Sequence, residues 1–96
     1  MNVKLIRMSS GEDVVTEVLE EKENSIVVQN AIVAIPAGNS QLGFAPWAPI
    51  LSRSKKELEV NSKFIVFIAD PDDSVVEQYE QMFSPISKPA GKKLIL

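Results

Sequence analysis

The chain contains neither cysteine nor histidine among its 96 residues. Without cysteine it can form no disulfide, no thiolate metal site and no thiol nucleophile. Without histidine it lacks the side chain whose unperturbed pKa lies nearest neutrality, and with it the usual general base and the commonest transition-metal ligand. We therefore expect a protein that is not an enzyme and that carries no metal ion and no cofactor.

Long apolar runs and an excess of positive charge are also missing. No stretch approaches the roughly 18–20 consecutive apolar residues of a membrane-spanning helix. Residues 1–5 do not open an apolar segment of the signal-peptide kind. The net charge is −3, whereas a broad nucleic-acid-binding face would be basic. We expect no contact with membranes and a cytoplasmic location.

What the sequence does contain is the pattern of a single, mainly β domain over residues 1–96. Hydrophobic residues make up 45% of the chain, an ordinary share for a globular domain. Segments rich in β-branched residues are separated by polar turns, and Pro46 and Pro49 allow only an irregular or edge strand beside them. We predict strands at residues 3–8, 14–21, 26–35, 42–47, 58–60 and 63–69.

The last third of the chain carries the start signal of a helix. Asp70 is a good N-cap, and Pro71 suits the first helical position because its missing N–H would be unpaired there anyway. We predict an amphipathic helix at about residues 71–83, followed by a tail at residues 84–96 that ends in three apolar residues. The apolar side chains of this helix fall within an arc of about 120°; they are Val75, Val76, Tyr79, Met82 and Phe83.

The strands at residues 26–35 and 63–69 are apolar on both faces, which a small sheet with one core does not require. The helix stripe can cover part of this excess. The rest would leave an apolar patch and a sheet edge exposed, and both invite pairing with another chain. We expect a homo-oligomer; the alternative is a monomer in which the helix and the tail cover everything. The predicted oligomer interface consists of Phe64, Ile65, Val66, Phe67 and Ile68.

Aromatic and basic residues are the candidates for RNA binding. Phe44 and Trp47 offer either a platform for base stacking or ordinary core and interface anchors. Clustered lysine and arginine side chains either contact phosphates or serve only as a solubilising surface. The complete candidate set is Phe44, Trp47, Arg53, Lys55, Lys56 and Lys63.

Two acidic clusters have a chemical and a structural interpretation. Carboxylates suit magnesium or calcium, but the spacing of an EF-hand loop is absent, and helix capping accounts for the first cluster. Carboxylates of the second cluster lie on opposite faces of a strand end and its turn, which favours a solvated turn over acid–base catalysis. The first cluster is Asp70, Asp72 and Asp73, and the second is Glu20, Glu21 and Glu23.

Residues 4–15, an apolar strand leading into a glycine turn, resemble the first strand and turn of the Sm-like family. The order of strands over about residues 3–69 and the segment 42–47 are similar to divergent Sm-like proteins carried by bacteriophages. The resemblance implies a small, strongly bent, five-stranded barrel of the SH3 type, here with a C-terminal helix, and a homo-oligomeric ring. It also implies RNA as the ligand, and the host cytoplasm as the location if a phage encodes the chain.

The residues with which that family binds uridine-rich RNA are replaced here. Its Asp–x–apolar–apolar–Asn signature has Glu23 at the acidic position and Val27 where asparagine would stand, and its later Arg–Gly pair is replaced at residues 61–63. We therefore hypothesise a ring that acts as a binding module, with RNA as the ligand but without the usual uridine pocket. The alternative is a structural or assembly protein that docks a partner protein through its helix and tail.

Overall fold

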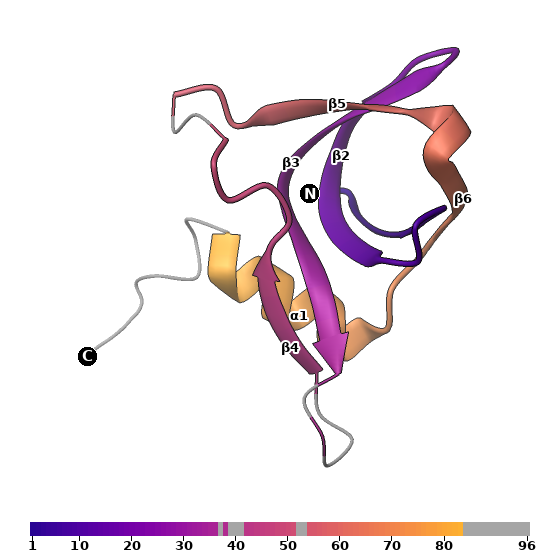
Figure 1. Cartoon of the computed structure of the whole chain (residues 1–96). Helices are drawn as coiled ribbons and strands as arrows, with labels where there is room; N and C mark the ends of the chain where they lie inside the picture. Colours follow the sequence, from indigo (N-terminus) through magenta and orange to yellow (C-terminus); the bar gives the residue numbers. More distant parts are fainter. Residues whose placement is uncertain (37, 39–41, 52–53, 84–96) are drawn as a thin grey trace.

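The computed structural model describes residues 1–36, 38, 42–51 and 54–83. This part is mainly β and forms one antiparallel six-stranded sheet followed by a short helix (Figure 1). The predicted tail at residues 84–96 lies outside the described residues. The elements are β1 (Val3–Met8), β2 (Asp13–Glu21), β3 (Ser25–Pro36), β4 (Leu42–Pro46), β5 (Glu57–Asn61), the single 3₁₀ turn η1 (Ser62–Phe64), β6 (Ile65–Ala69) and α1 (Asp73–Phe83).

Strand β3 is the longest strand and has different partners along its two halves (Figure 1). Residues 25–29 pair with β5 and residues 32–36 pair with β4. Between them, Asn30 has a φ of 55°, a left-handed conformation that asparagine tolerates. The described sheet has the six strands that the sequence pattern predicts, one more than the five that the Sm-like resemblance implies, because the chain leaves the sheet after β4, across Pro49, and returns to the other half of β3.

The sheet runs in the order β4-β3-β2-β1-β6, with β5 beside β3, and the hydrogen-bonded ladder between its described strands is not closed. Strand β6 starts at Ile65, two residues later than predicted. The preceding residues form η1, in which the side chain of Asn61 accepts a hydrogen bond from the backbone N–H of Lys63 at 3.0 Å. This local cap holds the sharp turn between β5 and β6 and keeps Lys63 out of the ladder.

Buried apolar side chains form two clusters on opposite faces of the sheet. Val14 and Val15 are consecutive on β2 and point to opposite faces, yet each is only 1% exposed. The sheet curls so that other strands cover one face of β2, and α1 covers the opposite face. A strand in this position can therefore be apolar on both sides. Core cluster one consists of Ile6, Met8, Val14, Val18, Ile26, Val28 and Val60, and core cluster two of Val3, Val15, Ile32 and Tyr79.

The helix starts later than predicted. It begins at Asp73, and its cap is Asp72 rather than Asp70. One carboxylate oxygen of Asp72 accepts hydrogen bonds from the backbone N–H of Ser74 at 3.1 Å and from its hydroxyl at 2.6 Å. These bonds hold the pKa of Asp72 below its usual value. Asp70 instead pairs with Lys4 on β1 at 2.6 Å, because the chain is still leaving the sheet at this point.

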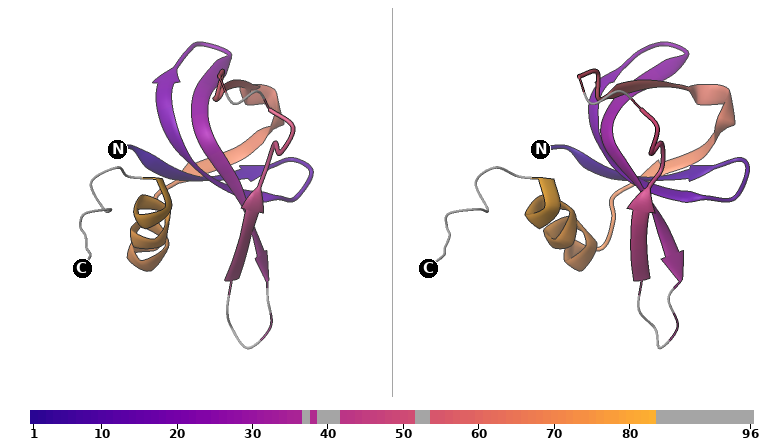
Figure 2. Two further views of the ribbon diagram at one scale, coloured as in Figure 1. Left: turned by 90° about the vertical axis from the view of Figure 1, so that its left-hand side faces the viewer. Right: turned by 60° about the vertical axis from the view of Figure 1, so that its left-hand side comes forward.

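Helix α1 lies on the outer side of the curled sheet (Figure 2), and its apolar stripe packs against core cluster two. Tyr79 is fully buried, and Val75, Val76 and Phe83 lie half-buried against core cluster two. Met82 does not join them, since 47% of it is exposed. At 100° per residue it lies at the edge of the stripe, roughly 60° from Tyr79. The predicted stripe is therefore confirmed without Met82.

Candidate functional site

The last residue of η1 and strand β6 together carry four exposed apolar side chains. Val66 is 63% exposed, Phe64 50% and Phe67 41%. Ile68 is 39% exposed, whereas Ile65 is half-buried against core cluster one. The structure thus brings four of the five predicted interface residues together at the surface. We name Phe64, Val66, Phe67 and Ile68 the β6 patch.

The β6 patch lies on a strand with one neighbour. Strand β6 pairs with β1, with Phe67 opposite Arg7 and Ile68 opposite Ile6, and no described strand lies on its other side. The backbone N–H and C=O groups on that side are an open edge. The apolar excess of β3 is partly covered, since Ile32 packs in core cluster two beneath α1, whereas Ile35 is 47% exposed. Strand β6 carries the longest run of consecutive exposed apolar side chains among the described strands.

Charged pairs on β1 flank the β6 patch. The Arg7 guanidinium lies 5.6 Å from the ring centroid of Phe67 and donates hydrogen bonds to both carboxylate oxygens of Asp13, one of them at 3.1 Å. These bonds raise the pKa of Arg7 and lower the pKa of Asp13. Lys4 pairs with Asp70 beside the far end of β6. An apolar centre with polar surroundings is the usual composition of a protein–protein interface.

The two aromatic candidates for RNA stacking pack on different sides of the sheet. Phe44 lies against core cluster two and Trp47 against core cluster one. The indole Nε1 of Trp47 donates a hydrogen bond to Glu12 at 3.1 Å. Hydrogen bonds from Ser10 and Trp47 lower the pKa of Glu12. Within one chain, Phe44 and Trp47 are therefore not brought together as one platform.

The basic candidates separate into two places. Lys55 and Lys56 are exposed just before β5 and line an open hollow of about 580 Å³ with Gln29 and Glu57. Lys63 lies on η1, with its ammonium 5.6 Å from the ring centroid of Phe64 in the β6 patch. Arg53 lies outside the described residues. Only Lys55 and Lys56 thus form a described basic pair.

The acidic clusters of the sequence have separate surroundings. Asp70 and Asp72 bind different partners, as described above, and Glu20, Glu21 and Glu23 are exposed at the end of β2 and its turn. Across the described ranges, no three Asp or Glu side chains converge into a group that could hold a metal ion.

Tyr79 has a polar role that the sequence pattern did not reveal. Its hydroxyl accepts a hydrogen bond from the backbone N–H of Glu17 and donates toward the carbonyl oxygens of Gln29 and Asn30. Burial raises the pKa of Tyr79 to about 12. A tyrosine at the centre of a buried stripe signals that its hydroxyl needs a partner. The sequence could not show which backbone groups provide it.

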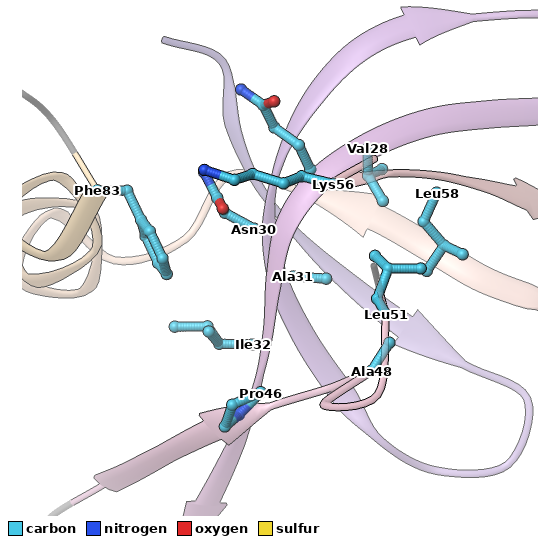
Figure 3. A pocket seen from close by; sticks show the side chains of 11 residues that line it. Val28, Asn30, Ala31, Ile32, Pro46, Ala48, Leu51, Lys56, Leu58 and Phe83 are labelled. Atoms are coloured by element: carbon cyan, nitrogen blue, oxygen red, sulfur yellow. The ribbon is translucent and has the colours of Figure 1, made fainter. Parts of the chain in front are cut away.

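A pocket of about 260 Å³ at the bend of β3 also escaped the sequence analysis (Figure 3). Its lining comes from β3, the segment after β4, the start of β5 and the last residue of α1. No motif links these positions, because they are scattered from Val28 to Phe83. Only the fold brings them together.

The described helix α1 is too short to cross a membrane. The sequence matches no protein-family model, and no curated protein matches it.

Proposed function

We propose that this chain is the subunit of an Sm-like homo-oligomeric ring that acts as a binding module. The observation that carries the proposal is the β6 patch, which lies on a strand whose outer edge has no partner among the described strands. Exposed apolar surface and an open strand edge both favour association. Pairing β6 with a strand of another copy buries the exposed apolar surface and provides hydrogen-bond partners for the open strand edge.

Three features of the sheet support a strongly bent barrel of the Sm-like type. Strand β3 divides its pairing between β4 and β5, β6 returns to pair with β1, and η1 carries the chain from β5 to β6. Core cluster one draws residues from β1, β2, β3 and β5, so the sheet curls around it.

Strand β5 is the proposed partner for β6 of the next copy. It pairs only with β3 among the described strands, so its outer edge is open as well. It exposes Glu57 and Glu59, whereas Lys63 lies in η1, two residues before β6. Pairing β6 with β5 brings these opposite charges to one interface. A contact between two different edges closes into a ring when the rotation between copies allows it.

RNA is the proposed ligand, supported by the exposed pair Lys55 and Lys56. Neither side chain forms an ion pair within the described part of the chain, so both ammonium groups are available to phosphates. A ring multiplies the pair by the number of copies. Oligouridine binding that weakens steeply with added salt supports this ligand; no binding to oligouridine at low salt contradicts it.

The alternative, docking of a partner protein through the helix and tail, has less support. The stripe of α1 is covered by the sheet, apart from Met82. Such a function would therefore rest on residues 84–96, which lie outside the described residues. Loss of partner capture on deleting this tail, without loss of assembly, would favour it.

The mass of the protein in solution tests the ring directly. We expect light scattering and native mass spectrometry to agree on one assembly of more than two chains. A monomer at high protein concentration contradicts self-assembly, and a dimer contradicts the ring.

Cysteine cross-linking tests which edges meet, since the chain has no cysteine of its own. We expect disulfide-linked pairs when the Val66→Cys and Glu59→Cys variants are refolded together and oxidised. Gln78→Cys on the exposed side of α1, refolded with Glu59→Cys, is the matched control. Linked pairs from Val66→Cys alone would indicate contact between two β6 strands and contradict the proposed pairing.

A further inference from the structure

The pocket at the bend of β3 is a concave site with mostly aliphatic walls. It forms where β3, the segment after β4 and the end of α1 meet (Figure 3). None of its lining residues belongs to the β6 patch, and one chain supplies all of them, so the pocket does not depend on the proposed ring. The apolar lining includes Val28, Ala31, Ala48, Leu51, Leu58 and Phe83.

The polar lining of the pocket is small and positively charged. It comprises Gln29, Asn30 and Lys56. In Figure 3, the side chains of Asn30 and Lys56 lie on the side of the pocket away from Pro46 and Ala48. Lys56 and the side-chain amide of Asn30 make no hydrogen bond or ion pair in the described part of the chain. An ammonium group without a counter-ion beside an apolar pocket suits a ligand with one anionic group.

We infer that this pocket binds a short aliphatic carboxylic acid, with its hydrocarbon chain among the aliphatic walls and its carboxylate at Lys56. The amide N–H of Asn30 provides a second donor for the carboxylate. Asn30 lines the pocket and has its left-handed backbone at the bend of β3. A sugar or a phosphate would lose its water inside these walls without gaining partners, so a hydrocarbon chain is the better occupant.

The volume of the pocket limits the length of the acid. At about 30 Å³ per atom-sized group, as for water in the liquid, 260 Å³ holds roughly nine non-hydrogen atoms. Octanoate, with its carboxylate at the rim, fills this space. Shorter acids leave part of the pocket empty, and longer acids extend into water. Affinity should therefore rise with chain length and then stop rising.

Titration calorimetry of the full chain with straight-chain acids tests this expectation. We expect one octanoate per chain, and a decrease in affinity of about 4-fold for each methylene group removed. Hexanoate should therefore bind roughly 15-fold more weakly than octanoate. Decanoate and dodecanoate should bind no more than a few-fold more tightly than octanoate. Affinity that keeps rising to dodecanoate, or no octanoate binding, overturns the inference.

Lys56 provides the test of the carboxylate. In the native protein octanoate should bind about 10-fold more tightly than octanol, the gain expected of a charge-assisted bond. Lys56→Met should abolish this preference and leave octanol binding unchanged. The matched control is Lys55→Met. It removes the same charge from the neighbouring residue, which does not line this pocket. An equal loss of octanoate affinity in both variants would indicate a general charge effect and contradict the site.

Two further measurements locate the ligand. Octanoate should shift the methyl resonances of Val28 and Leu58 while those of Val66 stay unchanged, and the reverse pattern would place the acid on the β6 patch. Ala48→Phe should abolish binding by filling the pocket, provided the methyl spectrum remains that of the folded protein. Ile95→Asp in the full chain tests the chain's own apolar tail as the occupant. Unchanged octanoate affinity is expected, and tighter binding would show that the tail occupies the pocket.

Discussion

The hydroxyl of Tyr79 on α1 accepts a hydrogen bond of 3.0 Å from the backbone N–H of Glu17 on β2. The pairing of β2 with β3 shifts register between Val15 and Glu17, which frees this N–H from the ladder. The same hydroxyl donates toward Asn30, whose carbonyl oxygen lies 2.9 Å away at the bend of β3. One buried side chain thus satisfies the backbone groups that the irregular part of the sheet leaves without strand partners.

Replacing this hydroxyl should lower the stability of the fold. Tyr79→Phe keeps the ring in core cluster two but removes the partner of the Glu17 N–H and of the Asn30 carbonyl oxygen, whereas the Gln29 carbonyl oxygen keeps its hydrogen bond from the Thr16 hydroxyl. We expect a loss of about 1–3 kcal/mol in the free energy of unfolding. Urea unfolding followed by the fluorescence of Trp47, the only tryptophan, measures it. Met82→Ala, on the exposed edge of the same helix, should change stability by less than about 0.5 kcal/mol.

The titration of Tyr79 should show the same burial. Its pKa is raised to about 12 in the folded protein, against about 10 in an unfolded chain. Because the folded pKa is the higher one, the contribution of the neutral Tyr79 hydroxyl to the free energy of unfolding is complete below about pH 10 and is lost as the pH rises toward 12. Tyr79 is the only tyrosine, so the absorbance of tyrosinate reports on it alone. A midpoint near pH 10 without denaturant would contradict the burial of the hydroxyl.

The Arg7–Asp13 pair should add a small pH dependence on the acid side. The hydrogen bonds from Arg7 lower the folded pKa of Asp13. The contribution is therefore complete above the unfolded pKa of about 4 and is lost as the pH falls through the lower folded value. Asp13→Asn should lower the urea midpoint at neutral pH, and this difference from the native protein should shrink in acid. Because both side chains are partly exposed, added salt should weaken the effect.

A charge on the β6 patch should prevent assembly. Val66→Lys places an ammonium group at the centre of the proposed interface, where association would remove it from water. We expect the mass in solution to decrease to that of one chain, with an unchanged circular dichroism spectrum. Gln78→Lys adds the same charge on the exposed side of α1 and should leave the mass unchanged. Equal masses for both variants would show that β6 is not the interface.

The start of α1 allows a comparison of two neighbouring carboxylates. Asp72→Ala removes the acceptor of both hydrogen bonds from Ser74, whereas Asp70→Ala removes only the exposed partner of Lys4. We expect Asp72→Ala to lower the thermal midpoint more than Asp70→Ala does. A larger decrease in the thermal midpoint for Asp70→Ala would indicate that Asp70 caps the helix, as the sequence pattern predicts.

The sequence pattern predicted exposed apolar side chains along residues 64–68, and the structure confirms this exposure for four of the five. Their role as an oligomer interface stays a prediction. The same reasoning expected the helix stripe to cover part of the apolar excess but could not show which part, because the cover on β3 comes from residues about 45 positions later in the chain, as with Ile32 and Val76. Nor could it separate Phe44 from Trp47, whose rings pack on opposite faces of the sheet.

The amino-acid sequence alone determined where strands and a helix form, because β-branched runs, turn residues and a 3.6-residue apolar period act over a few neighbouring positions. The first strand, for example, has its predicted bounds of residues 3–8. Only the tertiary structure decided that β3 bends at Asn30 to pair twice, that Tyr79 reaches that bend, and that a pocket opens beside it. These features join backbone and side-chain groups distant in sequence, and their energies depend on which groups folding excludes from water.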